Sequence, residues 1–404
     1  MTLSEELTWR GFVNQTTYDD VSALDGAPIS FYWGVDPSAS SMTIGNLAAA
    51  MMVRHFIDHG HKAYLLVGGA TGLIGDPDGK KEERDVKTLE DIERNKQAIA
   101  AQYTTVFAGQ EFSLVDNYDW FKDMNYIDFL RQVGKHVPIS NMIGRDFVQS
   151  RLGEGGAGIS YAEFSYSLIQ GYDFLHLFRE HGVSLQLCGA DQWGNSIAGV
   201  DLIRRSEAKE AHVFSSPLVI NKATGVKFGK SEGGAVWLDP TQTSVYQFYQ
   251  FWLNVDDAGV IDYMKIYTLL SQEEIMAIEE RHRANPSARE AQKTLAREVT
   301  TLVHGSERTE SVMRVTDVLF GGAEFASLHE DDIDALAQEI PTIGSSKTVV
   351  EALVETGTAA SNGEARRLID SGAISVNSLK VTEDQSITQR SLVKKGKNTF
   401  ILIR

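Results

Sequence analysis

The stretch from Ile29 to Gly69, "ISFYWGVDPSASSMTIGNLAAAMMVRHFIDHGHKAYLLVGG", contains the pattern that decides the fold. An apolar run typical of a strand, residues 29–35, leads through a turn of small residues into an apolar helical segment, residues 44–60. A second apolar run, residues 62–69, follows directly. Strand, helix and strand at this spacing predict an α/β fold with a doubly wound parallel sheet.

A further strand is predicted at residues 184–190, again followed by a helical segment. Polar, glycine-rich segments come after the predicted strands: "DPSASS", "GGATGLIGDPDGKKEER" and "GADQWGN". In doubly wound sheets, ligands bind at the carboxyl ends of the strands. We therefore expect the functional site where these three segments meet.

The second half of the chain has a different pattern. Between about Pro240 and Leu319 the sequence forms a series of amphipathic helical segments. A break rich in Pro, Gly and Ser at residues 340–347 predicts a linker. The last sixty residues contain two helical segments and several short strands, which indicates a small α+β module.

The charge of the chain is uneven. A formal net charge of -17 over 404 residues argues against a protein that coats nucleic acid. Residues 345–404, however, contain nine Lys/Arg and six Asp/Glu, and residues 390–404 contain five basic residues and no acidic one. This local excess fits a polyanion-binding module or an ordinary solvated basic tail.

The composition also excludes some classes of protein. The single cysteine, Cys188, cannot form an intrachain disulfide or a Cys-rich zinc site. No run of about 18 apolar residues occurs, so we expect no membrane span. The polar start of the chain lacks the features of a signal peptide, and we expect a cytoplasmic protein.

Residues 68–79 contain five glycines. The spacing matches neither a P-loop nor a dinucleotide-binding fingerprint. A lone glycine cluster is more often a tight strand-to-helix turn than a binding loop, but Asp76 within it favours a site that holds a cation. Lys80, Lys81 and Arg84 follow at once and could close over phosphates.

Other segments carry polar groups in an apolar context. Tyr166, Gln170 and Asp173 share one face of a predicted helix, which fits a pocket wall or a core helix with satisfied polar groups. Asp191 and Gln192 follow a predicted buried strand. The loop "VKFGKSEGG", residues 226–234, offers two lysines beside glycines, a weak signal alone. The ten histidines do not cluster as metal ligands.

Taken together, these segments resemble the bacterial tyrosyl-tRNA synthetases, a family of class I aminoacyl-tRNA synthetases. The matching motifs run in order over nearly the whole chain: "LTWRGFVNQTT", "GVDPSASSMTIGNL", "LVGGATGLIGDP", "DNYDW", "FLRQVGKH", "AEFSYSLIQGYDF", "GADQWGN", "KFGKSEGGAVWLDP" and "YQFYQFW". The last sixty residues, with "NGEARRLIDSGAISVN", resemble an S4-type RNA-binding module.

The resemblance implies a tyrosine–tRNA ligase. Such an enzyme activates L-tyrosine with ATP, bound as its Mg²⁺ complex, to tyrosyl-adenylate and pyrophosphate, and then transfers the tyrosyl group to the 3' end of tRNA(Tyr). It implies no protein-bound metal. It also implies a Rossmann-like catalytic domain over residues 1–222, with a dimer-forming insertion near residues 115–160. An α-helical domain with the KFGKS loop over residues 223–335 and an S4-like domain over residues 345–404 would follow, in a homodimer.

The resemblance also assigns roles to individual residues by motif. Tyrosine would be bound by Tyr32, Gly34, Asp76, Asn117, Tyr166, Gln170, Asp173 and Gln192. ATP would be bound by Asp36, Ser38, Gly45, Asp191 and Lys230, and catalysis would use Thr43, Asn46, Lys80, Arg84, Lys227, Lys230 and Ser231. Contacts with tRNA would come from Arg366, Arg367, Lys394, Lys395 and Lys397.

Two departures from the family pattern stand out. Class I synthetases usually have His-x-Gly-His where this chain has Thr43-Ile44-Gly45-Asn46, so both imidazoles are replaced by smaller polar groups. This leaves open a second interpretation, an inactive paralogue that only binds RNA. The family also prefers glycine where this chain has Cys188. Tryptophan as the amino acid is a further alternative, which Tyr32 and Asp173 disfavour.

Overall fold

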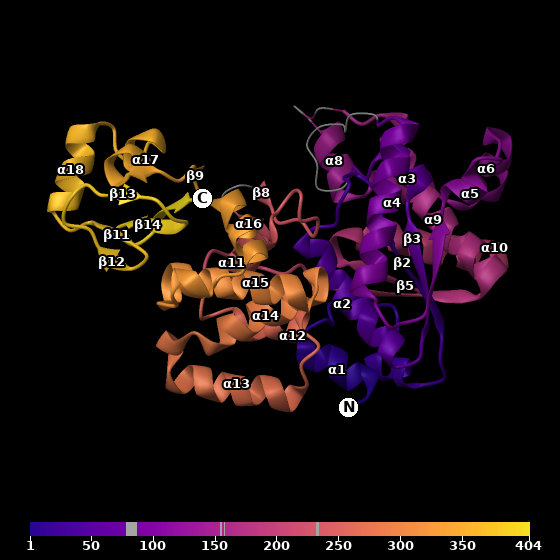
Figure 1. The fold of residues 1–404 in the computed structure, drawn as a ribbon. Coiled ribbons are helices and arrows are strands. Elements are labelled where there is room, and N and C mark those ends of the chain that lie inside the picture. Colours follow the sequence, from indigo (N-terminus) through magenta and orange to yellow (C-terminus); the bar gives the residue numbers. More distant parts are fainter. Residues whose placement is uncertain (78–86, 154–155, 157, 232–233) are drawn as a thin grey trace. The chain divides into compact units, whose positions relative to one another are not determined.

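The computed structural model describes residues 1–77, 87–153, 156, 158–231 and 234–404 (Figure 1). These residues form two compact units. Unit 1 contains residues 1–243 and 251–299, and unit 2 contains residues 244–250 and 300–404. Helices α11 (Val245–Leu253) and α14 (Glu290–His304) contribute residues to both units.

Unit 1 is built on a six-stranded sheet with the order β1-β6-β5-β2-β3-β4. Its strands are β1 (Gln15–Thr16), β2 (Ser30–Val35), β3 (Lys62–Val67), β4 (Phe112–Asp116), β5 (Val183–Gly189) and β6 (His212–Ser216). All neighbouring strands are parallel except β1 and β6. The predicted doubly wound parallel sheet is therefore confirmed. The chain winds outward in both directions from the β2–β5 pair, and the crevice at this switch point is where such sheets bind ligands.

Helices cover both faces of this sheet (Figure 1). Helices α2 (Ile44–Asp58) and α4 (Leu89–Val106) pack on the face that carries Phe31 and Trp33. Helices α9 (Tyr161–His181) and α10 (Trp193–Glu207) pack on the opposite face, which carries Tyr32 and Tyr64. Successive side chains of a strand point to opposite faces, so Tyr32 and Trp33 belong to different layers of the core.

The N-terminal helix α1 (Leu3–Arg10) ties distant parts of unit 1 together. Arg10 donates hydrogen bonds to the carbonyl oxygens of Lys265, Thr268 and Leu270 at 2.8–3.1 Å, where helix α12 (Val260–Tyr267) ends. On its other side, Arg10 pairs with Glu6 at 2.9 Å. The orphan carbonyls of a helix end are thus satisfied by a buried guanidinium group.

The remaining helices of unit 1 are shorter or lie at its periphery. They are α3 (Gly69–Ile74), α5 (Tyr118–Phe121), α6 (Tyr126–Gln132), α7 (Ile139–Ile143), α8 (Asp146–Leu152) and α13 (Gln272–Ala284). The amphipathic helices predicted between Pro240 and Leu319 are present as α11 to α15. Among the described residues, no helix is both long and apolar enough to cross a membrane.

Unit 2 combines helices with a five-stranded sheet of order β12-β11-β14-β15-β9. Its helices are α15 (Ser306–Thr316), α16 (Glu330–Glu339), α17 (Val349–Glu355) and α18 (Asn362–Asp370). Its strands are β9 (Thr342–Ile343), β11 (Ile374–Val376), β12 (Leu379–Lys380), β14 (Ser391–Lys395) and β15 (Thr399–Ile403), beside the pair β10 (Lys347–Thr348) and β13 (Ser386–Ile387).

Residues 340–347, expected to be a linker, contain strand β9 and the first residue of strand β10. Strand β9 runs parallel to β15, and the side chain of Ile343 packs against the core of the last module. Leu392, Phe400 and Leu402 in turn pack in one apolar cluster with helices α15 and α16. Because of these contacts, residues 300–404 cluster as one unit. The boundaries assigned to the three domains stay predictions.

Candidate active site

A buried hydrogen-bond network lies at the carboxyl edge of the sheet of unit 1. Asp36 directly follows strand β2 and accepts two hydrogen bonds, one from the hydroxyl group of Tyr166 and one from that of Thr71, each at 2.7 Å. Tyr166 comes from helix α9 and Thr71 from helix α3, so residues distant in sequence meet at one carboxylate. Burial, and then the charge of Asp36, raise the pKa of Tyr166 well above its ordinary value, which keeps this phenol a donor.

The network continues from Thr71 to Asp173 on helix α9. Asn117, which follows strand β4, donates to the Thr71 hydroxyl oxygen at 3.0 Å and to Asp173 Oδ2 at 3.1 Å. Trp120 donates its indole N–H to Asp173 Oδ1 at 2.9 Å. Burial raises the pKa of Asp173 well above its ordinary value, and the two donors act in the opposite direction. An Asp173 carboxyl group can accept from a phenol when ionised and donate to it when protonated.

Tyr32 on β2 faces the layer of the core that is covered by helix α9, which carries Asp173. Its side chain is 2% exposed, and among the described residues its hydroxyl group has no hydrogen-bond partner. The ring lies 5.3 Å from that of Phe174, the residue after Asp173. Burial and then the charge of Asp173 raise the pKa of Tyr32. A buried hydroxyl without a protein partner is costly unless a ligand supplies one.

Asp76 and Gln192 form the next part of this edge. The Gln192 amide donates to Asp76, which is only 9% exposed, and accepts from Asn195 at 3.1 Å. Gln192 ends the short 3₁₀ turn η3 (Ala190–Gln192) that follows β5. Gln170 lies one turn before Asp173 on helix α9 and is half-buried. The helix face predicted from the spacing of Tyr166, Gln170 and Asp173 thus points toward the same edge.

Two glycines of the predicted cluster make room for this network. A Cβ atom on Gly68 would lie 2.1 Å from Thr71 Oγ1 and 2.4 Å from Asp36 Oδ1. A Cβ atom on Gly69 would lie 2.3 Å from Oδ1 of Asp116. These glycines therefore let polar side chains of the protein itself approach the backbone closely.

The segment before helix α2 forms a second part of the site. The backbone N–H and the hydroxyl group of Thr43 both donate to Asn46 Oδ1, at 2.9 and 3.0 Å. Thr43 and Asn46 thus bond to each other across the first turn of α2. Gly45, between them, is exposed, and so is Ser38 in the preceding turn.

The KFGKS loop is attached to this segment by backbone pairing. Ile44 donates to the carbonyl oxygen of Val236 at 3.1 Å, and Leu238 donates to that of Met42 at 2.9 Å. Within the loop, Phe228 stacks on Tyr263 with ring centroids 4.2 Å apart. The loop and the start of α2 therefore share one hydrogen-bonded framework.

The charged residues of the loop are described only in part. The Lys227 ammonium group lies 3.5 Å from a carboxylate oxygen of Asp191, and both side chains are about half exposed. Lys230 and Ser231 form the short strand β7, but their side chains lie outside what the structure describes. Lys80, Lys81 and Arg84 also lie outside the described residues. Their predicted positions over phosphates stay predictions.

The sequence patterns do not identify Thr71 or Trp120 as site residues. Thr71 lies inside the glycine-rich segment, and Trp120 lies in "DNYDW", the same short segment as Asn117. No local sequence spacing points to either residue, because their hydrogen-bond partners lie on other elements of the fold. Cys188, on β5, is buried, and burial raises the pKa of its thiol to about 12.

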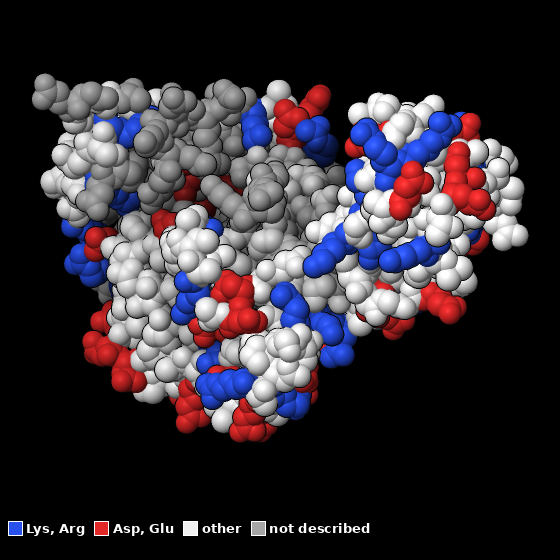
Figure 2. Space-filling model, turned by 90° about the vertical axis from the view of Figure 1, so that its left-hand side faces the viewer, with Lys and Arg blue, Asp and Glu red and all other residues white. Residues whose placement is uncertain are grey.

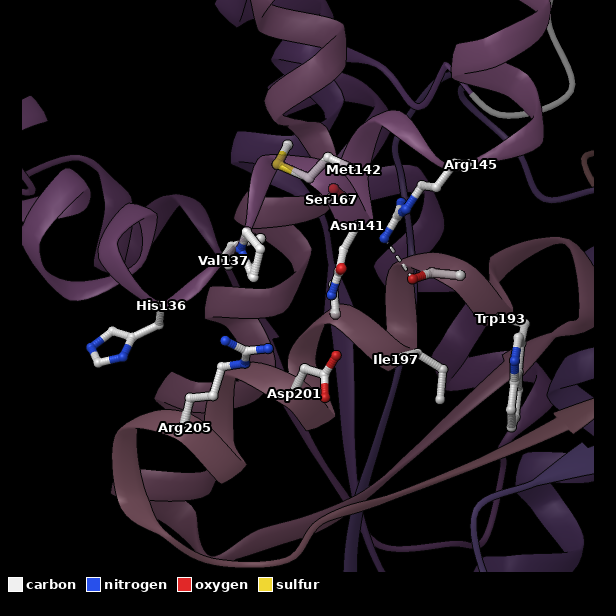
Figure 3. Close-up of a pocket in the computed structure, with 13 residues that line it drawn as sticks. His136, Val137, Asn141, Met142, Arg145, Ser167, Trp193, Ile197, Asp201 and Arg205 are labelled. Carbon is white, nitrogen blue, oxygen red and sulfur yellow. Dashed lines mark hydrogen bonds between the residues drawn. The ribbon is translucent and has the colours of Figure 1, made fainter.

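A cavity of 240 Å³ lies elsewhere on unit 1, between helix α10 and residues 136–145 (Figure 3). Arg145 borders it and donates to the carbonyl oxygen of Gly194 and to Asn195 Oδ1, each at 2.7 Å. Asp201 and Arg205 of α10 also line it (Figure 3). None of the residues predicted to bind tyrosine or ATP lines this cavity.

The basic residues predicted to contact tRNA lie in unit 2. Arg366 and Arg367 on helix α18 and Lys397 in the β14–β15 turn are exposed. Lys394 and Lys395 on β14 instead donate their ammonium groups to the carbonyl oxygens of Leu319, at 3.2 Å, and Thr358, at 2.7 Å. Figure 2 faces the side that carries these elements and shows Lys and Arg side chains interspersed with Asp and Glu.

No group of three or more His, Cys, Asp or Glu side chains that could hold a metal ion occurs among the described residues.

Comparisons with known proteins agree on one family. The family described as tRNA synthetases class I (W and Y) matches residues 24–321, and the Tyrosine--tRNA ligase SYY-like C-terminal domain matches residues 332–404. The "Tyrosine--tRNA ligase 2" of Bacillus cereus is 43% identical over 422 residues, with 100% of both chains covered. The "Tyrosine--tRNA ligase" of Limosilactobacillus fermentum is 42% identical and covers 100% of this chain and 97% of its own.

A solved structure supports the same grouping. A C-terminally truncated Aspergillus nidulans mitochondrial tyrosyl-tRNA synthetase has a TM-score of 0.72 and 29% identity, covering 79% of this chain and 94% of that one. None of these relatives has a name that supports the inactive-paralogue interpretation. The first family match includes tryptophan enzymes, whereas the C-terminal match and the full-length relatives are tyrosine enzymes.

Proposed function

We propose how this chain, which belongs to the class I tyrosyl-tRNA synthetase family and is a tyrosine–tRNA ligase, binds its substrates and stabilises its transition state. The reaction has two steps. The carboxylate of tyrosine forms a bond to the α-phosphorus of ATP as the bond to pyrophosphate breaks. A ribose hydroxyl at the 3' end of tRNA(Tyr) then takes the tyrosyl group and AMP leaves.

The phenol of tyrosine lies between Tyr32 and Asp173 in this proposal. The observation that carries it is the buried hydroxyl of Tyr32, which has no partner in the described part of the chain, because a substrate hydroxyl would supply a hydrogen bond there. Phenylalanine would leave the Tyr32 hydroxyl group without a partner and would deprive Asp173 of its hydrogen bond with the substrate. A site of this kind rejects an analogue that lacks the hydroxyl by about 10⁴–10⁵, and this enzyme family is the established example.

The ammonium and carboxylate groups of tyrosine lie nearer the edge of the sheet. Asp76, Tyr166 and Gln170 bind the ammonium group, and Asn117 and Gln192 complete the polar surroundings. Gly34 lines the same site in this proposal, and a Cβ atom there would lie 3.1 Å from Leu66 Cδ2 on the neighbouring strand. The fixed hydrogen bonds of this edge hold the substrate carboxylate in position for attack.

ATP, bound as its Mg²⁺ complex, occupies the second part of the site. Asp36, Ser38 and Gly45 line its position, and Asp191 binds the ribose, replacing its contact with Lys227. Thr43 and Asn46 donate hydrogen bonds to the phosphates and ribose in place of the family's histidines. Lys80, Arg84, Lys227, Lys230 and Ser231 converge on the departing pyrophosphate. Donors that engage only in the transition state raise the rate and not merely the affinity.

The tRNA binds to the basic residues of unit 2. Arg366, Arg367 and Lys397 present exposed charges to phosphates. Lys394 and Lys395 add positive charge while their ammonium groups hold neighbouring backbone carbonyls. Local positive charge of this kind lets an acidic protein bind RNA, and a cytoplasmic location fits these substrates.

The enzyme acts as a homodimer in this proposal. Residues 126–161 expose several large apolar side chains, including Ile127 at 62%, Ile139 at 64% and Tyr161 at 63%. Exposed apolar side chains gathered in one segment are typical of a protein–protein interface. This segment coincides with the insertion near residues 115–160.

Tyrosine-dependent exchange between ATP and pyrophosphate tests the site. We expect exchange with tyrosine, and far less with phenylalanine or tryptophan. Tyr32→Phe removes one partner of the phenol and should lower the preference for tyrosine over phenylalanine by about 10-fold, or about 1.4 kcal/mol. Wild-type preference in this variant, or better activation of tryptophan by the native enzyme, would contradict the assignment of the pocket.

A further inference from the structure

Thr71 is the middle member of a hydrogen-bond chain that joins the two halves of the site. Its hydroxyl oxygen lies 2.7 Å from Asp36 Oδ1 and 3.0 Å from Asn117 Nδ2. Asn117 Nδ2 also donates to Asp173 Oδ2 at 3.1 Å. The chain therefore runs from the carboxylate after β2, on the ATP side, to the carboxyl group on α9 that faces the phenol.

The direction of every hydrogen bond in this chain is fixed. Asn117 Oδ1 accepts from the backbone N–H of Ala70 at 2.7 Å, so the amide NH₂ must face Thr71 and Asp173. An amide nitrogen can only donate, and the Thr71 oxygen therefore accepts from it. The single hydroxyl proton of Thr71 is left for Asp36.

The chain is also enclosed. Thr71 is 2% exposed and Asn117 is 0% exposed. The Thr71 hydroxyl packs so closely on the backbone of Gly68 that a Cβ atom there would lie 2.1 Å from it. Bulk water does not reach Thr71 or Asn117, so a hydrogen bond lost between these two residues is not replaced by solvent.

Removing the Thr71 hydroxyl would have an effect at a distance. One N–H of Asn117 would be buried without an acceptor, and the amide would shift to find one. Because the other N–H of the same amide holds Asp173, that shift would change the orientation of the Asp173 carboxyl group. Asp36 would lose one of its donors at the same time.

We propose that Thr71 is a positioning residue that fixes Asp173, through Asn117, for recognition of the phenol, and that the preference for tyrosine over phenylalanine depends on its hydroxyl group. The inference rests on the proposed roles of Asp36 and Asp173. Thr71 touches neither substrate in this scheme and acts through Asn117.

The test compares Thr71→Val with Thr71→Ser in ATP–pyrophosphate exchange. Valine keeps the shape and removes the hydroxyl, whereas serine keeps the hydroxyl. For Thr71→Val we expect the KM for tyrosine to rise about 10-fold or more, and the KM for phenylalanine to change by less than about 3-fold. Thr71→Ser should keep the wild-type preference, because its hydroxyl can make the same two bonds.

The outcomes separate this inference from the assignment of the pocket. A native enzyme that activates tyrosine without a preference over phenylalanine would contradict the pocket itself. A preferring native enzyme and a folded Thr71→Val variant with an unchanged preference would overturn the role of Thr71 alone. An equal rise in KM for both amino acids would also overturn it, since that result indicates general damage.

If Thr71→Val does not fold, Thr71→Cys replaces it in the same assay. A thiol fits the space but is a weak donor and a weak acceptor. It should lower the preference for tyrosine over phenylalanine below that of Thr71→Ser. A wild-type preference in folded Thr71→Cys would refute the inference.

Discussion

At the scale of single residues, the bond between Thr43 and Asn46 allows two uses of one threonine. At the N-cap of helix α2, the Thr43 hydroxyl donates to Asn46 Oδ1 at 3.0 Å and helps to hold the first turn. In the proposed catalytic role, the same hydroxyl would instead donate to the phosphates of ATP. The first role affects the stability of the protein and the second affects kcat, so a substitution distinguishes them.

Thr43→Ala tests the catalytic use. Loss of a transition-state donor costs about 10²–10³ in kcat, whereas loss of a cap costs about 1 kcal/mol of stability and leaves kcat unchanged. We expect the kcat of tyrosine activation to fall by at least about 10-fold, with little change in the KM for tyrosine. Thr43→Ser is the matched control and should keep most of the activity. Unchanged kcat in the alanine variant would leave Thr43 a cap only.

The sequence predicts the residues of the site better than their connections. Tyr166, Gln170 and Asp173 could be placed on one helix face because helix periodicity is regular. Asp36 and Gln192 could be placed at one edge because each follows a predicted strand, whereas Asn117 was named only through the family resemblance. Thr71 could not be placed, because its importance comes from its partners Asp36, after β2, and Asn117, after β4, and no local spacing in the sequence records these contacts.

At the scale of elements, helices α1 and α2 meet at a buried histidine. His55 on α2 lies with Nδ1 3.3 Å from Glu6 of α1. Burial lowers the pKa of His55 to about 3, and the positive charge of Arg10 acts in the same direction. His55 is therefore neutral in the folded protein at neutral pH, with Nδ1 close to the Glu6 carboxylate.

This histidine makes stability depend on pH. In the unfolded chain its pKa is near the ordinary value of 6.5. Between pH 6.5 and 3, the unfolded state then binds one more proton than the folded state. Its contribution to stability is complete above pH 6.5 and falls below it, by up to about 1.4 kcal/mol per pH unit.

His55→Gln should reduce this dependence, because glutamine can donate to Glu6 but does not titrate. We expect the urea midpoint of the native protein to fall between pH 7 and pH 5 more steeply than that of the variant. His61, His176 and His212, whose pKa values burial also lowers, leave a residual slope in both proteins. Equal slopes would show that His55 does not carry this effect.

The elements themselves differ in how far the sequence predicts them. The strands and helices of residues 29–69 have four or more residues of regular apolar pattern, and the structure confirms them. Strands β9 and β10 have two residues each, too few for any periodicity. Residues 340–347 looked like a linker because Pro, Gly and Ser dominate there, while β9 forms only through its pairing with the distant strand β15.

At the scale of the whole molecule, the proposed activation site and the basic residues proposed to bind tRNA belong to different units. Truncation near Gly344 is a poor test of their separate roles. It would also remove Leu392, Phe400 and Leu402 from the apolar cluster that they form with helices α15 and α16. Substitutions on the surface of unit 2 are the cleaner test. They leave this cluster intact.

The double variant Arg366→Ala/Arg367→Ala tests tRNA binding. We expect unchanged tyrosine-dependent exchange and a KM for tRNA raised about 10-fold or more. The slope of affinity against salt should fall by about 1.4–1.8 if both residues contact phosphates. Arg390→Ala is the control, because Arg390 is exposed but paired with Glu330 at 2.6 Å. Normal charging by the double variant would rule out this role for helix α18.

The apolar surface near residues 126–161 makes a prediction about assembly. A charge at Ile139, which is 64% exposed, should be tolerated by the fold but not by a dimer interface. We expect Ile139→Glu to convert dimers into monomers, measured by light scattering with size-exclusion chromatography. Met276→Glu on α13, also an exposed apolar position, should leave the mass unchanged. If the native protein and the Ile139→Glu variant both have the mass of a monomer, the proposed homodimer is refuted.

The burial of Cys188 has a practical consequence for measuring tRNA binding and dimer formation in solution. It is the sole thiol of the chain, and with a pKa of about 12 almost none of it is thiolate at neutral pH. The native protein should therefore react negligibly with a maleimide dye, and a cysteine introduced at Lys397 should take up one dye per chain. A fluorescent dye can thus be attached at an introduced cysteine in the wild-type sequence without first replacing Cys188. Rapid labelling of the native protein would show that Cys188 becomes accessible in solution.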